Sequence, residues 1–229
     1  GLIRDVRDFG LPYRDMTDLI RRITPSEKER ISDPEAALDG RPLRLSSVRV
    51  CSPIPHPEQD IICLGVNYAA HADESAQFDR KAFLLDRKKA TYFSKRAYQT
   101  SGPDDLIPSY PELVTSLDYE AELAVIIGRD CKNVCERDAA ACIFGYTVLN
   151  DVSARNLQTE HNQWYFGKSL DGFTPMGPCI VTEDEIPYPP ALSISSTVNG
   201  ELRQNSNTKY LLHSISEIIA ELSQGMTLL

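Results

Sequence analysis

The chain has 229 residues and a mass of 25.6 kDa, and its 33 acidic and 24 basic side chains give a formal net charge of −9. This acidic balance argues against a nucleic-acid-binding protein, because contact with phosphates requires a basic face. The length and an apolar content of 41% predict a globular protein with one large domain, or a small domain and a larger one.

The sequence contains no pattern typical of export or of a membrane span. Charged side chains begin at Arg4 and Asp5, so no apolar signal-peptide core follows Gly1. The longest aliphatic run, residues 123–127, is far shorter than the ~20 residues that cross a bilayer. The six cysteines form no C-x-x-C pair, which favours reduced thiols. We therefore expect a cytoplasmic protein without membrane contact.

Residues 1–57 predict a small N-terminal domain with a linker. Thr24-Pro25 and Asp33-Pro34 each place a capping side chain ahead of a proline at the first position of a helix. Gly40 is expected to close the second of these short helices. Three prolines then indicate a linker that reaches residue 57.

Residues 58–229 consist of short apolar runs separated by turn signals, which predict a β-rich mixed α/β domain. Alternation over residues 192–198, followed by Asn199-Gly200, predicts a hairpin with a type I′ turn. Ser214 and Glu217 form a capping box before an amphipathic helix that ends near residue 225. Residues 226–229 are apolar and resemble the entry to another strand, so we expect the domain to continue beyond them. Further strands are expected over residues 61–64, 119–127 and 144–149, and further helices over residues 136–143 and 152–159.

Three carboxylates fall at the ends of two expected strands. Glu120 and Glu122 lie two apart, so both point to one face of their strand. Either they lie at the solvent end of a half-buried strand, or a positively charged group lies between them. Asp151 follows the next strand, and alone it would be interpreted as a helix N-cap. Together the three suit a hard divalent cation, Mg²⁺ first with Mn²⁺ or Ca²⁺ as alternatives, whereas zinc prefers histidine and cysteine.

Other polar residues have both a catalytic and an ordinary interpretation. Arg155 and Gln158 share a helix face and could orient a substrate carboxylate, or they are simply solvated. His71 and Glu74 form an H-x-x-E pair that could activate water, or they are a surface ion pair. Lys168 could stabilise a developing enolate, or it is an ordinary exposed lysine.

Four motifs in order resemble those of the fumarylacetoacetate hydrolase family. They are G-x-N-Y-x-x-H-x-x-E, D-Y-E-x-E-L-A-x-x-I-G, G-Y-x-x-x-N-D-x-S-A-R-x-x-Q and G-K-S-x-D, in residues 65–74, 118–128, 145–158 and 167–171. The resemblance covers residues 58–229 and implies a mixed β-sandwich roll with short flanking helices, preceded by a small N-terminal unit. It also implies a homodimer.

The resemblance assigns a role to each of these polar residues. Asn156 departs from the aspartate that many members carry. The implied metal ligands are Glu120, Glu122 and Asp151, the implied catalytic residues are His71, Glu74 and Lys168, and the implied substrate-binding residues are Arg155 and Gln158.

The implied activity is that of a metal-dependent hydrolase in the catabolism of aromatic or 2-oxo acids. It would cleave a C–C bond of an acylpyruvate-like 2,4-dioxo acid by way of a metal-stabilised enolate. The alternatives are an isomerase of a 2-hydroxymuconate-type diacid, an oxaloacetate decarboxylase, and a non-catalytic binding member. The pair His71 and Glu74 argues against the last, because a binding protein needs no base beside its metal.

Overall fold

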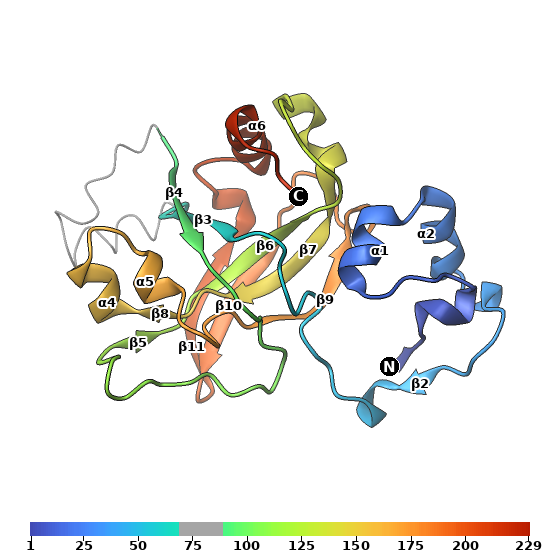
Figure 1. Ribbon diagram of the computed structural model, residues 1–229, viewed down its shortest axis with the longest axis horizontal. Coiled ribbons are helices and arrows are strands. Elements are labelled where there is room, and N and C mark those ends of the chain that lie inside the picture. The colour runs from blue at the N-terminus through green and yellow to red at the C-terminus, as the bar shows by residue number, and fades with distance from the viewer. Residues whose placement is uncertain (69–88) are drawn as a thin grey trace.

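A computed structural model of the chain describes residues 1–68 and 89–229 (Figure 1). Short strands dominate, and short helices lie between them, which confirms the expected β-rich mixed α/β class. The strands are β1 (Leu2–Ile3), β2 (Leu43–Arg44), β3 (Ile61–Gly65), β4 (Thr91–Lys95), β5 (Leu117–Asp118), β6 (Ala121–Ile127), β7 (Ile143–Asn150), β8 (Ser153–Ala154), β9 (Met176–Thr182), β10 (Ser193–Val198) and β11 (Glu201–Asn207). The α-helices are α1 (Met16–Arg22), α2 (Pro25–Ser32), α4 (Arg155–Glu160), α5 (Tyr165–Lys168) and α6 (Ile215–Gly225).

The antiparallel sheet β6-β7-β9 lies at the centre of the larger part of the chain. Its middle strand β7 is buried along most of its length, and successive side chains point to opposite faces. Ile143 packs with α6 on one face, while Phe144 packs with the N-terminal unit on the other. The α6 face is completed by buried apolar residues, namely Cys131, Ala139, Cys142, Tyr146, Ile215, Ile219 and Leu228.

The N-terminal unit is joined to this sheet by a shared apolar cluster. Around Phe144 lie five buried side chains of the unit, and α1 and α2 sit beside the end of the sheet in Figure 1. An ion pair between Lys28 and Glu183, with 2.6 Å between Nζ and Oε2, adds a polar link. The unit's members of the cluster are Phe9, Leu11, Tyr13, Leu19 and Ile20.

Strands β3 and β4 form a separate antiparallel pair. Ile61 lies opposite Lys95, and Cys63 lies opposite Phe93. The Phe93 ring meets Trp164 edge-on, with ring centroids 5.3 Å apart. This pair therefore brings a lysine and a cysteine from β4 and β3 toward the region where β6 begins.

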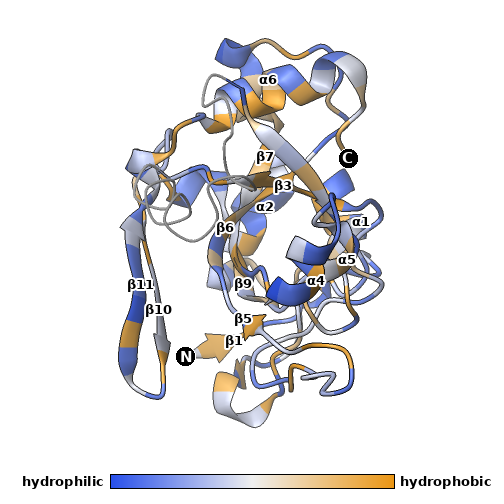
Figure 2. Ribbon diagram, turned by 90° about the vertical axis from the view of Figure 1, so that its left-hand side faces the viewer, coloured by the Kyte–Doolittle hydropathy of each residue, from blue (hydrophilic) through white to orange (hydrophobic). Residues whose placement is uncertain are grey.

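The hairpin and the capping boxes agree with the sequence predictions. Strands β10 and β11 pair antiparallel around Asn199 and Gly200, whose φ values of 52° and 82° are those that a type I′ turn requires. Figure 2 shows this hairpin at one side of the molecule and α6 at its top. Ser214 accepts from Glu217 N at the start of α6, and Glu217 bonds back to Ser214 N. Thr24 caps α2 in the same way.

Three expected helices differ from the structure. The helix expected over residues 152–159 begins later, as α4, because Ser153 and Ala154 pair with β5 and stay extended. Asp151 is consequently not a helix cap, and Ala154 takes that position. Residues Glu136–Cys142 form a 3₁₀-helix in place of an α-helix. A 3₁₀-helix at Pro34–Ala36 stands where a second N-terminal α-helix was expected. The other 3₁₀-helices span Val6–Phe9, Leu45–Ser47, Glu183–Glu185 and Thr208–Tyr210.

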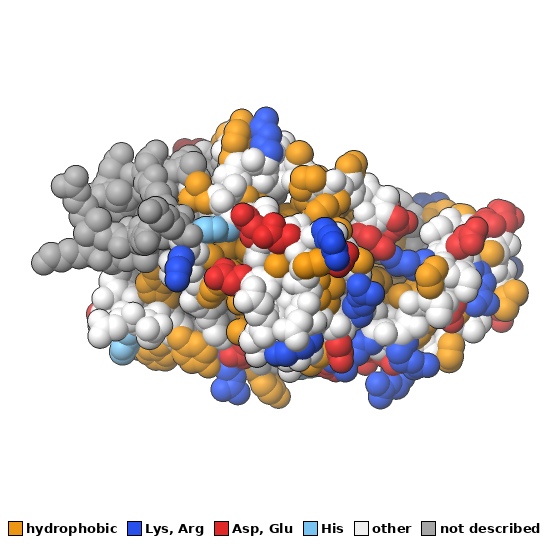
Figure 3. All heavy atoms as spheres, turned by 90° about the horizontal axis from the view of Figure 1, so that it is seen from above, with side chains coloured by type: hydrophobic (Ala, Val, Ile, Leu, Met, Phe, Trp, Pro, Cys, Tyr) orange, Lys and Arg blue, Asp and Glu red, His pale blue; other side chains and the backbone are white. Residues whose placement is uncertain are grey.

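The surface carries both signs of charge. Figure 3 shows acidic and basic side chains interspersed with apolar ones on the described part of one face. Among residues 1–68 and 89–229, no helix combines the length and the apolar character that a bilayer crossing requires. The longest of these helices, α6, has 11 residues.

We predict that Gly167→Ala separates α5 from α4. A Cβ at this position would lie 2.6 Å from Gln158 N and 2.8 Å from Ala154 O. Since these are backbone atoms, the helices must move, and we expect a loss of about 2 kcal/mol in the free energy of unfolding, measured in urea. Gly225→Ala is the matched control, because a Cβ there meets no atom within 4 Å. Equal stabilities of Gly167→Ala and the unmodified chain would contradict this close approach.

Candidate active site

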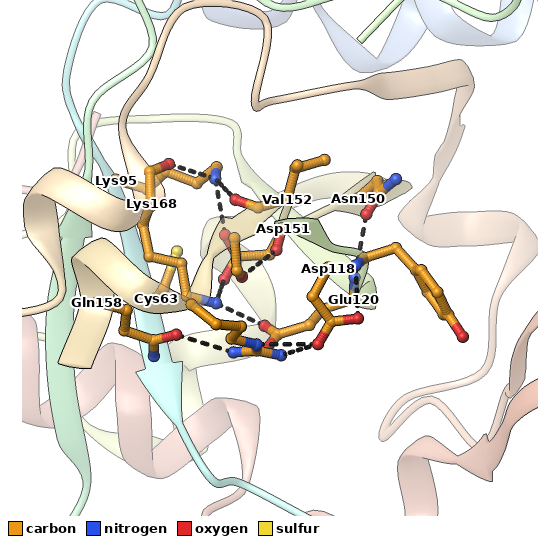
Figure 4. Close-up of polar contacts among 12 residues, drawn as sticks. Cys63, Lys95, Asp118, Glu120, Asn150, Asp151, Val152, Gln158 and Lys168 are labelled. Atoms are coloured by element: carbon orange, nitrogen blue, oxygen red, sulfur yellow. Dashed lines mark hydrogen bonds and ion pairs between the residues drawn. The ribbon is translucent and has the colours of Figure 1, made fainter. Parts of the chain in front are cut away.

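A cluster of charged side chains gathers where β6 begins and β7 ends (Figure 4). The antiparallel register places Ala121 opposite Asn150, so the start of β6 lies beside the residue that follows β7. The backbone N–H of Asp151 donates to Glu120 O over 2.8 Å, and this hydrogen bond holds the two residues next to each other. Two carboxylates distant in sequence are thereby brought together by strand pairing.

The Lys168 ammonium lies between these two carboxylates. Its Nζ donates to Glu120 Oε2 over 2.6 Å and to Asp151 Oδ2 over 2.7 Å. The lysine side chain is 2% exposed, so it is not the ordinary surface lysine that the sequence also allowed. Burial alone would lower the pKa of Lys168, but Glu120 and Asp151 outweigh that effect and raise it. The group is therefore an ammonium at neutral pH.

A second buried lysine, Lys95, completes the surroundings of Asp151. Its Nζ lies 2.8 Å from Asp151 Oδ1 and donates to Val152 O over 3.1 Å and to Lys168 O over 2.5 Å. Burial lowers the pKa of Lys95, and Lys168 adds to that, although Asp151 opposes it. Burial also acts to raise the pKa of Asp151, but the two lysines outweigh it and lower the pKa. Asp151 is thus held by the side-chain nitrogens of two buried lysines.

Arg155 connects the cluster to α4 and β5. Its Nε and Nη2 donate to Asp118 Oδ2 over 2.9 and 2.6 Å, and Nη2 also donates to Glu120 Oε1 over 2.6 Å. Its Nη1 donates to Gln158 Oε1 over 2.9 Å. The amide nitrogen of Gln158 has no acceptor among the described residues and remains able to bind a ligand.

Glu122 is the carboxylate of the cluster that forms no ion pair with the described residues. Within the described part of the chain, no hydrogen-bond donor pairs with it. Burial, followed by repulsion from Glu120 and Asp151, raises the pKa of Glu122 from 4.5 to about 8. At neutral pH the carboxyl group is therefore mostly protonated. The other described carboxyl groups of the cluster each pair with a lysine or arginine side chain, namely Asp118 and Glu120 with Arg155, Glu120 with Lys168, and Asp151 with Lys95 and Lys168.

A cavity of about 940 Å³ opens onto the cluster. The cluster lines it with four carboxylates and with Arg155, Gln158 and Lys168, and apolar side chains of β3, β6 and α6 also line it. The carboxylates are those of Asp118, Glu120, Glu122 and Asp151. Cys63 also lines it, but burial raises the pKa of this thiol, so it is not a thiolate nucleophile. The volume is in the range of small-molecule sites.

The donor set fits a hard divalent cation in its chemistry. Three carboxylates face one buried region, Glu122 lacks a donor among the described residues, and Asp151 Oδ1 is buried without an aligned hydrogen bond. In the positions described, no three acidic, histidine or cysteine side chains converge closely enough to hold one ion. The reason is that the ammonium of Lys168 stands between Glu120 and Asp151. A bound cation would share these two carboxylates with that lysine.

The structure thus brings six of the eight residues singled out in the sequence into one cluster. The other two, His71 and Glu74, lie outside the described residues. The sequence reasoning missed Asp118 and Lys95, which contact the cluster directly. The sequence could have indicated Asp118, because a residue two positions before Glu120 is expected on the same face of an extended strand. Lys95 ends the mixed strand Thr91–Lys95, and only its burial distinguishes it from a surface lysine.

We predict that Glu122→Gln removes a pH-dependent loss of stability. Between pH 4.5 and about 8 the folded chain keeps a proton on Glu122 that the unfolded chain has released, so stability falls as pH rises. The glutamine variant lacks this loss, and its advantage should grow by on the order of 1 kcal/mol per pH unit across that window. Urea unfolding in EDTA from pH 5 to 8.5 measures it, and parallel pH curves for the two proteins would contradict the raised pKa.

Comparisons with known proteins place this chain in a family. The family model described as fumarylacetoacetate (FAA) hydrolase C-terminal matches residues 60–229. Oxaloacetate tautomerase YisK of Bacillus subtilis (strain 168) is 42% identical over 184 residues, which cover 80% of this chain and 60% of that protein. Mitochondrial oxaloacetate tautomerase fahd2 of Xenopus laevis is 38% identical over 225 residues, which cover 96% of this chain and 66% of that protein.

A solved structure is similar over most of the chain. It is maleylpyruvate hydrolase from Sphingobium sp. SYK-6 in complex with manganese(II) and pyruvate, which is 33% identical, with a TM-score of 0.70 over 93% of this chain and 70% of that one. The chain spans less than two thirds of the length of the two curated relatives it matches. The motifs, the mixed α/β fold and the family model agree, and the chain belongs to the fumarylacetoacetate hydrolase family, whose members are enzymes.

Proposed function

We propose that this chain acts on a small 2-oxo acid through an enolate, and that its reaction is the keto–enol tautomerisation of oxaloacetate or a closely similar diacid. The observation that carries the proposal is the buried Lys168 ammonium, which is bonded to the carboxylates of Glu120 and Asp151 in the lining of a cavity. Support for the substrate comes from two relatives, 42% and 38% identical, that are named oxaloacetate tautomerases.

Glu120, Glu122 and Asp151 are the residues that would hold a divalent cation, Mg²⁺ or Mn²⁺. Such an ion, when bound, polarises the 2-oxo group as a Lewis acid. Glu122 would lose its proton on binding, because a cation supplies the positive charge that its surroundings lack.

Lys168 stabilises negative charge on the substrate and does not act as a base. Its pKa is raised, so it keeps its proton through the reaction. A fixed ammonium in a buried site favours the enolate more than the neutral keto form. Gln158 can donate its free amide hydrogens to a substrate carboxylate, and Arg155 holds that amide in place.

Tautomerisation moves one proton from C3 of the oxo acid to the oxygen on C2. The base proposed for C3 is His71 with Glu74, on the strength of the sequence motif alone. Proton transfer at C3 needs a group that exchanges protons near neutral pH, which suits an imidazole. The same enolate arises in the other reactions that the resemblance implied.

Hydrolysis of a C–C bond is the second candidate. It was the first expectation from the sequence, and the 33% identity to a maleylpyruvate hydrolase whose structure contains manganese and pyruvate favours it. Cleavage would leave a pyruvate enolate at the position that Lys168 stabilises. Product analysis with oxaloacetate and with an acylpyruvate separates the two activities.

We predict that Lys168→Met and Glu122→Gln each lower the rate of oxaloacetate enol–keto exchange by about 100-fold, because each removes part of the charge arrangement that the enolate requires. The rate is followed by the enol absorbance with Mg²⁺ and again in EDTA. Glu160→Gln, a change at an exposed residue of α4, is the control and should keep full activity. Full activity of the unmodified protein in EDTA would overturn the metal dependence.

We predict separately that His71→Ala lowers kcat for the same exchange by about 100-fold while the affinity for Mn²⁺ stays unchanged, since the imidazole would move a proton and would not bind the ion. Mn²⁺ affinity is measured by electron paramagnetic resonance of the free ion. An unchanged kcat would remove His71 from the mechanism.

A further inference from the structure

The β10–β11 hairpin makes a specific contact with the backbone between Glu120, which directly precedes β6, and Glu122 within β6. Gln204 Oε1 accepts a hydrogen bond from Ala121 N over 2.9 Å. The hydroxyl of Ser196 donates to the same oxygen over 2.8 Å, which holds the amide in place. Ala121 lies directly between Glu120 and Glu122, so an amide from a distant hairpin controls the residue that links them.

A β-bulge accounts for the direction of this side chain. Ser196 pairs with Gln204, but the next pair is Thr197 with Leu202, so one residue of β11 is left extra at this point. Bulges turn a strand and re-aim its side chains. Gln204 is half-buried, while Arg203 before it and Asn205 after it are exposed. The hairpin therefore presents Gln204, held by Ser196, to the start of β6.

The same stretch of backbone is held from its other side by the end of β7. Asn150 Oδ1 accepts from Glu120 N over 3.1 Å, and Glu120 O accepts from Asp151 N over 2.8 Å. With Gln204 on the hairpin side, the peptide groups around Glu120 and Ala121 are restrained from two directions. The spacing of the two glutamate side chains depends on these restraints.

We propose that Gln204 is a positioning residue that sets the separation and direction of the Glu120 and Glu122 carboxylates for a divalent cation, an inference that rests on the function proposed above. Gln204 is uncharged, and its contacts are with Ala121 N and Ser196. Any effect of its loss on cation binding is transmitted through the β6 backbone. Without it, the Ala121 N–H loses its acceptor, and this part of β6 shifts to find another.

The test is a titration with Mn²⁺, followed by electron paramagnetic resonance of the free ion, on the full 229-residue chain. Gln204→Met keeps the length of the side chain but removes the acceptor, and we expect it to weaken Mn²⁺ binding by about tenfold, the scale seen when partners outside the ligand set are lost. Gln204→Glu keeps an acceptor oxygen at the same reach and should bind Mn²⁺ at least as tightly as the unmodified chain.

Asn205→Met is the matched control, because Asn205 neighbours Gln204 on β11 but is exposed. It should leave Mn²⁺ affinity unchanged, and urea unfolding of every variant checks that the fold is kept. If Gln204→Met does not fold, Ser196→Ala is used in its place. Ser196→Ala removes the hydroxyl that holds the Gln204 amide, so this variant should also weaken Mn²⁺ binding.

The outcomes separate this inference from the proposed function. Tight Mn²⁺ binding that is lost in Glu122→Gln but unchanged in Gln204→Met would overturn the role of Gln204 and leave the metal site standing. Equal weakening by Gln204→Met and Gln204→Glu would also overturn it, because the acceptor oxygen would then not matter. No Mn²⁺ binding by the unmodified chain would overturn both.

Discussion

The ion pairs of Lys168 with Glu120 and Asp151 are the interaction on which the rest of the site depends. They join a residue of α5 to the start of β6 and the end of β7, in a region from which water is nearly excluded. A buried charge without a partner is strongly destabilising, so each member requires the others to be present. Lys95 is a further buried member of this network. It pairs with Asp151 and donates hydrogen bonds to the carbonyl oxygens of Val152 and Lys168.

The balance of charge also explains where a ligand would act. Glu122 is the carboxylate that bonds to no donor among the described residues, and burial, followed by repulsion from Glu120 and Asp151, raises its pKa. Either a bound divalent ion or a proton can neutralise the charge of the Glu122 carboxylate. Lys168 and the Gln158 amide nitrogen, which has no acceptor among the described residues, would give the proposed substrate side a positive character that suits an anionic oxo acid. Under the proposed function, one buried arrangement would hold both a cation and an enolate.

The site also depends on contacts between backbone elements and on the distant β10–β11 hairpin. The register of β6 against β7 sets which residue faces Asp151, and a one-residue slip would turn Glu120 and Glu122 away together. Packing of α4 against α5 at Gly167 brings Gln158 and Lys168 close. Gln204 reaches the same strand from the β10–β11 hairpin. Geometry at the cluster is thus the product of several remote contacts.

The sequence alone was sufficient for the features that arise from local rules. The Asn199-Gly200 turn, the Ser214 capping box and the common face of Glu120 and Glu122 follow from φ preference, capping and strand periodicity. Motif order was sufficient for the family. Local rules failed at residues 152–154, where pairing with β5 outweighed the helix signal.

Only the tertiary structure decided which charges are buried and which side chains meet. Lys95 and Asp151 are 56 positions apart in sequence, as the numbering gives directly, and Ala121 and Gln204 are 83 apart. No periodicity relates such positions. Their contact depends on strand register and on a bulge in the hairpin, and their energetics depend on the exclusion of water, which exists only once the chain has folded.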